Sequence, residues 1–226
     1  MTAPATTDSE HEEVPAALDE GGRAPARRYG VLALAAMLVV GLLLGYAGGL
    51  FTPRLTRPGD ASVEAGFARD MTTHHSQAVE MSLTAYRSAT LPEVRQIAVD
   101  IATGQQGEIG AMQTWLRGWD LSPTGSQPPM SWMPDGADAL KNRNGLMPGM
   151  ASPQEMAALR NAQGIEVDRQ FLALMINHHL GGVHMIDGVL GETDNAEVLR
   201  VARTMKATQQ TELNNLRQLQ AKAAKS

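Results

Sequence analysis

The sequence of 226 residues contains no cysteine. Without thiols the chain can form no disulfide, no thiolate zinc site and no cysteine nucleophile, so those classes of scaffold and enzyme are excluded. Aromatic residues are also scarce, at 4% of the chain, and the formal net charge of -5 leaves no excess of basic residues. Because nucleic-acid-binding domains carry such an excess, the composition predicts no nucleic-acid partner.

The chain is rich in methionine and contains two pairs of adjacent histidines. It holds 13 methionines and 6 histidines, including the pairs His74-His75 and His178-His179. These pairs belong to a longer repeat with an offset of 104 residues, which relates Phe67, Met71, Met81, Gln105 and Glu108 to Phe171, Met175, Met185, Gln209 and Glu212. One offset shared by two long segments predicts a duplicated two-helix unit.

The N-terminal part of the chain has two regions of different composition. Residues 1–28 contain almost no large apolar side chain, which predicts a disordered leader. Residues 29–51 carry no charge and are nearly all apolar, which is long enough for a helix that spans a bilayer. The apolar region of a signal peptide is usually shorter, so we interpret this segment as an uncleaved transmembrane signal anchor; cleavage near residues 47–49 is the alternative.

The orientation of this anchor follows from the arginines on its two sides. Slightly more positive charge precedes the span than follows it, from Arg23, Arg27 and Arg28 against Arg54 and Arg57. Since positive flanks stay inside, the leader is expected to be cytoplasmic and everything after the span extracytoplasmic. The sequence therefore predicts a single-pass protein of the cell membrane.

After a predicted stalk at 52–60, helical periodicity dominates the chain. Apolar residues recur at three- and four-residue spacing in two units, 61–119 and 165–223, each long enough for two helices. The linker 120–164 between them is rich in proline and glycine. Two short-turn helix pairs joined by one long connection predict an all-α, ferritin-like four-helix bundle over residues 61–226.

Two sequences of capping-box type mark expected helix starts within this bundle. They are Thr90-Leu91-Pro92-Glu93 and Ser152-Pro153-Gln154-Glu155. In such a box the first side chain accepts from the helix and the glutamate binds back to it. Helices are therefore expected to begin just after Thr90 and Ser152.

Polar residues lie on the apolar stripes of the predicted helices. His74 and His178 lie between methionines, and Gln105, Glu108, Gln209 and Glu212 also face the core. A buried imidazole or carboxylate without a partner costs several kcal/mol. We therefore expect these side chains to meet one another, with the glutamates accepting from imidazole N–H groups. They could form a purely structural polar network that fixes helix register.

The alternative use of the same residues is metal binding. Imidazole, thioether and carboxylate together make a metal-ligand set, and thioethers favour Cu(I). A di-iron site of the ferritin-like kind needs Glu-x-x-His motifs, and neither Glu108 nor Glu212 has a histidine three residues later. Copper is thus preferred over iron. His184 is interpreted as a solvated or auxiliary residue. Four linker methionines serve either as packing or as a copper-loading arm, namely Met130, Met133, Met147 and Met150.

Three segments of the chain resemble domain-of-unknown-function family 305 (DUF305). They are Phe67 to His75, Gln105 to Leu116 and Phe171 to His179, and the similarity extends from about Ala61 to Leu219. The resemblance implies a ferritin-like bundle that is typically exported, in a family with periplasmic copper-binding members. One departure is Gly181-Gly182, which loosens the helix near the second histidine pair.

Together these observations predict a membrane-anchored extracytoplasmic protein that binds a transition metal, most favourably Cu(I), for sequestration or delivery. The expected ligands are His74, His75, His178 and His179, with thioethers from Met71, Met81, Met175 and Met185, and with Glu108 and Glu212 as ligands or as partners that orient the imidazoles. Two alternatives stay open: a ferritin-like metallo-oxidase, and an interaction module whose polar interior is only structural.

Overall fold

The structure of the protein is a computed structural model that describes residues 26–55 and 57–225, with the backbone alone at 26–29 and 50–55. It divides into two compact units, residues 1–56 and 57–226, which are described separately. The predicted leader at 1–28 lies almost wholly outside the described residues. The first unit is therefore described through helix α1, Ala26–Leu55.

Helix α1 contains an apolar stretch, Gly30–Gly49, of 20 residues with a mean hydropathy of 2.3. Its leucine, valine and methionine side chains are exposed, and none of this stretch is buried within the protein. Exposed apolar surface of this extent marks a site of contact with a membrane or with another protein. By length and composition α1 fits a membrane anchor or a signal sequence. It ends at Leu55, inside the segment expected to be a stalk.

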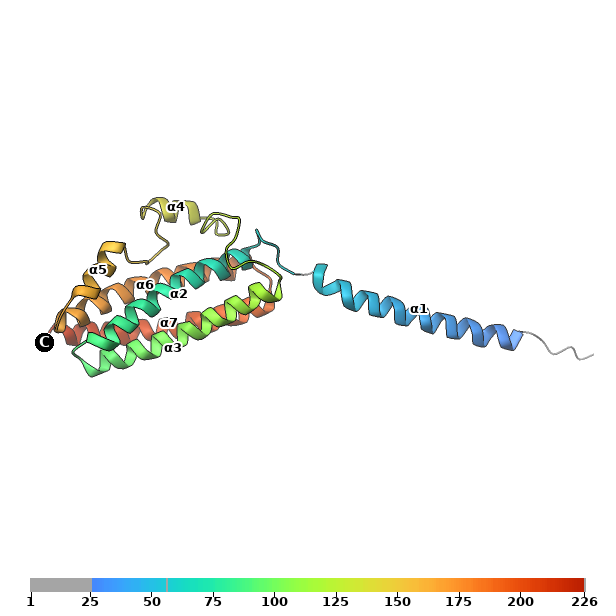
Figure 1. Ribbon diagram of the computed structural model, residues 1–226, viewed down its shortest axis with the longest axis horizontal. Coiled ribbons are helices and arrows are strands. Elements are labelled where there is room, and N and C mark those ends of the chain that lie inside the picture. Colours follow the sequence, from blue (N-terminus) through green and yellow to red (C-terminus); the bar gives the residue numbers. More distant parts are fainter. Residues whose placement is uncertain (1–25, 56, 226) are drawn as a thin grey trace, which may run out of the picture. The chain divides into compact units, whose positions relative to one another are not determined.

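The second unit is a bundle of four long helices with two short ones in the linker (Figure 1). The long helices are α2 (Val63–Ser88), α3 (Pro92–Gly118), α6 (Ile165–Glu192) and α7 (Ala196–Ala223), and the short ones are α4 (Gly136–Lys141) and α5 (Pro153–Asn161). The described residues contain no β-strand. The predicted all-α bundle, built from two duplicated helix pairs and preceded by one apolar helix, is confirmed.

Within the bundle each duplicated unit is a helical hairpin. Helix α2 packs most extensively on α3 and α6 on α7, while the two hairpins meet mainly along α2 and α6. The Thr193 hydroxyl after α6 donates to the Glu64 carboxylate at the start of α2, so these two helices run antiparallel. The pseudo-equivalent histidine pairs are therefore brought together where α2 and α6 meet.

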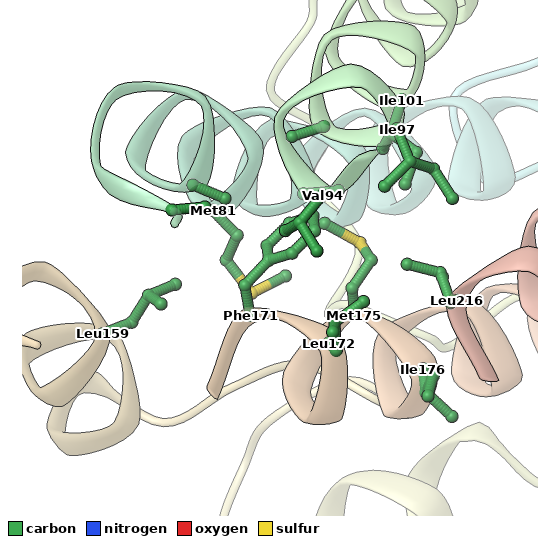
Figure 2. Close-up of a cluster of buried hydrophobic side chains, with 14 of the residues drawn as sticks. Met81, Val94, Ile97, Ile101, Leu159, Phe171, Leu172, Met175, Ile176 and Leu216 are labelled. Carbon is green, nitrogen blue, oxygen red and sulfur yellow. The ribbon is translucent and has the colours of Figure 1, made fainter. Parts of the chain in front are cut away.

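Two apolar clusters fill the bundle. Cluster A lies around Met81, Phe171 and Met175, and Figure 2 shows these side chains converging with Val94 of α3. Cluster B lies around Phe67, Met71 and Met185. Fully burying one such side chain contributes roughly 1.5–3 kcal/mol, so the two clusters supply most of the driving force for closing the bundle.

Of the two predicted capping boxes, the one at Ser152 is confirmed and the one at Thr90 is wrong. The Ser152 hydroxyl accepts from the Glu155 amide, and the Glu155 side chain accepts from Ser152, as expected. Helix α3, however, begins after Leu91 without any side-chain cap of its own. The buried carboxylate of Asp168 in α6 accepts instead from the amides of Thr90 and Leu91, at 2.8 and 2.9 Å. A long-range carboxylate thus replaces the local cap.

The linker is fastened to the bundle by a second buried carboxylate. Asp70 of α2 accepts from the Met130 amide at 2.6 Å and from Trp132 Nε1 at 2.8 Å. The Trp132 ring also packs edge-on against Phe67, with centroids 5.7 Å apart. Burial raises the pKa of Asp70, against the opposing effect of these two hydrogen bonds. The linker is therefore a packed layer over the bundle rather than a free connection.

Candidate metal centre

The four paired histidines form a polar layer between the two apolar clusters. Met71 precedes His74 by one turn and belongs to cluster B, while Met81 follows His75 and belongs to cluster A. We call His74, His75, His178 and His179 the histidine layer; each has at most 1% of its surface exposed. An imidazole at this depth must be satisfied by the protein or by a ligand.

His75 and His179 are satisfied in the same way in the two halves. His75 Nε2 donates to Glu108 Oε2 at 2.7 Å, and His179 Nε2 donates to Glu212 Oε2 at 2.7 Å. The glutamates lie one helix away, on α3 and α7, and keep partial contact with solvent. A His–Glu hydrogen bond, as expected from the sequence, is present in both halves, but His75 and His179 make it rather than His74 and His178, which the helical spacing had placed towards the core. In the neutral imidazole this bond places the proton on Nε2, and Nδ1 is then a lone pair.

His74 and His178 face each other across the contact between the two hairpins. Their ring centroids are 3.8 Å apart, with planes inclined at 34°. His74 Nε2 donates to the carbonyl oxygen of Pro148 in the linker at 2.9 Å. The two halves differ here, because His178 Nε2 has no partner among the described residues.

Four buried imidazole nitrogens are consequently left without a hydrogen-bond partner in the described part of the chain. They are Nδ1 of His74, His75 and His179, together with Nε2 of His178. Such a nitrogen is a lone pair when the imidazole is neutral and its proton lies on the other ring nitrogen, which is the form in which histidine ligates metals. The arrangement can therefore accept an electrophile, provided that the imidazoles stay unprotonated.

Two of the imidazoles are held neutral by their surroundings. Burial lowers the pKa of His74 to about 3, with a further contribution from the neighbouring His75. Burial likewise lowers the pKa of His178 well below its ordinary value, followed by the effect of His74. Both effects disfavour the imidazolium form, so both rings are available as neutral groups far below neutral pH.

The glutamines of the same layer differ from expectation. Gln105 and Gln209 are both buried. In the described structure, Nε2 and Oε1 of Gln105 have no hydrogen-bond partner, and neither does Oε1 of Gln209. Gln209 lies against Gly182, where an added Cβ would be 2.6 Å from its Oε1. The expectation that both glutamines join the His–Glu network is wrong.

The methionines predicted as ligands are divided between the two clusters. Met71 and Met185 lie in cluster B, whereas Met81 and Met175 lie in cluster A, and all four are fully buried. Met71 and Met175 each lie one helical turn from a histidine pair, which is the spacing at which side chains meet. The linker residues Met130, Met133 and Met147 are buried in cluster B as packing residues.

The histidines and carboxylates do not by themselves form a metal-binding cluster in the described structure. The described residues contain no group of three or more His, Asp or Glu side chains that could hold one metal ion together. His184 lies apart from the layer, is exposed, and pairs with Asp135 at 3.1 Å.

The Pro148 carbonyl makes a contact to the histidine layer that the sequence did not suggest. It comes from the irregular linker, 74 residues away from His74. The only signal was the pair Gly181-Gly182, interpreted as loosening the helix. An added Cβ on Gly181 would lie 2.0 Å from the Pro148 oxygen, so this glycine leaves room for the linker backbone.

Comparison with known proteins adds a family and a set of similar folds. The model of a domain of unknown function, DUF305, matches residues 64–220. A DUF305 protein from Streptomyces coelicolor, predicted to be secreted, is 39% identical over 74% of this chain and 96% of its own, with a TM-score of 0.67. A DUF305 fragment from Deinococcus radiodurans is 31% identical over 71% of this chain and 96% of its own, with a TM-score of 0.59.

A third similar structure is that of CopM in its Cu(I)-bound form. It is 25% identical over 72% of this chain and 95% of its own length, with a TM-score of 0.52. No curated protein matches the chain.

Proposed function

This chain belongs to the DUF305 family, and we propose that it is a membrane-anchored, extracytoplasmic protein that binds copper as Cu(I) for sequestration or delivery. The ligands are drawn from the histidine layer and from the thioethers of Met71, Met81, Met175 and Met185. Glu108 and Glu212 hydrogen-bond to His75 and His179 and hold each imidazole in one orientation.

The observation that carries this proposal is the set of buried imidazole lone pairs without partners. A purely structural network would be expected to satisfy its own members, since an unsatisfied buried polar atom costs about 1–3 kcal/mol. Here the glutamates satisfy Nε2 and leave Nδ1 directed at nothing in the described structure. Adjacent thioethers make the set soft, and soft sets favour Cu(I) over Zn(II) or manganese. The similar CopM is known in Cu(I)-bound and Cu(II)-bound forms.

Competition for copper tests the proposed ligands. The full chain in detergent should withdraw Cu(I) from a chelator of known affinity, while Zn(II) is removed from it by a weak chelator. Replacing the four methionines by leucine, which nearly preserves side-chain volume, should lower Cu(I) affinity without unfolding the bundle. His184→Ala, at the exposed histidine of α6, is the control and should change nothing. Zn(II) held as tightly as Cu(I) would contradict the proposal, and no metal at all would favour the structural network.

The proposed location has its own test. With α1 as an anchor and the bundle outside, protease added to spheroplasts should digest residues 57–226 while cytoplasmic marker proteins survive. The expectation follows from the uncharged stretch Gly30–Gly49 and the arginines that precede it. A bundle that is digested only after the membrane is lysed would show the opposite orientation. A bundle recovered free in the medium would identify α1 as a cleaved signal sequence.

A further inference from the structure

One short linker segment, Met147–Ala151, lies directly on the histidine layer. Its Pro148 carbonyl accepts from His74 Nε2 at 2.9 Å. At Gly149, which has a φ of +78°, an added Cβ would be 2.4 Å from the Asn177 oxygen and 2.9 Å from the Cα of His178. The segment therefore touches both members of the His74–His178 pair, and it does so through its backbone.

The repeat explains how one segment can lie on both hairpins. Gln77 and Gly181 are equivalent positions, 104 residues apart, and both contact this segment. Gln77 Nε2 donates to the Ala151 oxygen at 2.9 Å, and the Ala151 amide donates to Gln77 Oε1 at 2.7 Å. Gly181 offers a bare helix surface on which the Pro148 carbonyl rests. In the first hairpin Gln77 therefore anchors the segment through hydrogen bonds, and in the second hairpin Gly181 leaves space for its backbone.

We propose that Met147–Ala151 is a cover that must lift from the His74–His178 pair before a metal ion reaches the two imidazoles. That a metal ion binds at this pair rests on the proposed copper function. The pair is only 1% exposed, so some part of the protein has to move for an ion to bind. The cover makes four hydrogen bonds: the two at Gln77, the one from His74, and one from Arg143 Nη2 to the Met150 oxygen at 3.0 Å. Its end residues Met147 and Ala151 also pack in clusters B and A, respectively. Lifting it breaks no helix.

The cover also determines which imidazole nitrogen is free. By accepting from His74 Nε2, the Pro148 carbonyl fixes the proton there and leaves Nδ1 of His74 as the lone pair. Within the described part of the chain, His178 Nε2 has no such acceptor. The two pseudo-equivalent histidines are thereby made different, and the thioethers of Met147 and Met150 lie on the cover itself, on either side of the Pro148-Gly149 pair.

Gly181→Ala tests the cover without altering an imidazole. Its methyl group would occupy the place of the Pro148 carbonyl, 2.0 Å away, and should displace the cover. Gly191→Ala is the matched control, because it makes the same change in the same helix with nothing within 4 Å. Gln77→Ala is a second variant that removes the anchor and adds no atoms, so it cannot fail through a clash.

Two measurements on the full chain in detergent separate the outcomes. The first is metal-free: modification of histidines by diethyl pyrocarbonate, mapped by mass spectrometry, with exposed His184 as the internal standard. The second is the association rate of Cu(I). Both variants should accelerate modification of His74 and His178, and Cu(I) association, by about three- to tenfold, the factor expected for losing one or two hydrogen bonds.

Each result has a definite meaning. Faster modification and faster Cu(I) association in Gly181→Ala and Gln77→Ala, but not in Gly191→Ala, would support the cover. Unchanged modification of His74 and His178 in both variants would overturn it, whatever copper does. Faster modification in proteins that bind no Cu(I) would overturn the copper function while supporting the cover over the pair.

Discussion

Replacing His74 and His75 together by alanine should lower Cu(I) affinity nearly as much as replacing all four histidines. His74 and His178 come from different hairpins, yet their rings are 3.8 Å apart, so an ion bound at either ring would also be next to the other. Ligands of one site act as a unit, and their effects are strongly non-additive. The loss should exceed about 100-fold, since residues that merely orient a ligand already cost 10–100-fold.

The opposite arrangement would give a different stoichiometry. If each hairpin held its own ion, the same double variant would bind half as much copper and would keep the affinity of the remaining site unchanged. Copper per protein and affinity should therefore be measured together, by titration and by competition with a chelator. The reciprocal variant, with His178 and His179 replaced, should behave alike. His184→Ala again serves as the control, and a clean halving of bound copper would contradict a shared site.

Helical periodicity was sufficient to predict the bundle and the depth of the histidines. His74 and His178 follow the spacing of their apolar neighbours, so folding the stripe inward had to bury them. Burial then required an acceptor for each imidazole N–H, and the glutamates on the same core-facing stripes were the available ones. That requirement predicts a His–Glu pair in each half, but it does not predict that His75 and His179, rather than His74 and His178, make the pair. The resemblance to DUF305 is likewise confirmed by the matching family model.

Contacts made by irregular segments could not be predicted in the same way. The Pro148 carbonyl reaches His74 across 74 residues, and Asp168 reaches the start of α3 across 77 and 78. Neither contact follows from helical periodicity, because any backbone carbonyl can accept and any carboxylate can cap. The box at Thr90 was wrong for this reason. The Thr90 amide, which the Glu93 side chain would have bound in a capping box, donates to the buried Asp168 carboxylate of α6 instead, as does the Leu91 amide.

The duplication itself limits what the sequence can predict about the site. Two equivalent hairpins suggest two equivalent histidine pairs, and at His75 and His179 the halves do agree. The linker, however, exists in one copy, so it can contact only one side of the pseudo-symmetric centre in any given way. It accepts from His74, whereas His178 Nε2 has no partner among the residues that the structure describes. The difference between the halves therefore arises from the segment that is not repeated.

The metal-free bundle should lose stability as pH falls below about 6.5, the ordinary pKa of histidine. In the folded state burial lowers the pKa of His74 to about 3 and that of His178 well below its usual value. At pH values between the folded-state and unfolded-state pKa of each histidine, the unfolded chain binds a proton that the folded chain does not bind. The free energy of unfolding therefore decreases as pH decreases. Each such histidine contributes up to about 1.4 kcal/mol per pH unit, or about 2 kcal/mol between pH 6.5 and 5.

Denaturant unfolding of residues 57–226 at pH 7, 6 and 5, with a chelator present, measures this slope. His74→Gln should flatten it, because glutamine has no group that titrates there and can still donate to the Pro148 carbonyl. Asp70 acts in the opposite direction, since burial raises its pKa, but it is present in both proteins and cancels in the comparison. Equal slopes for the two proteins would mean that His74 protonates as readily in the fold as in water. Bound Cu(I) should steepen the loss, because protons and the ion then compete for the same imidazole nitrogens.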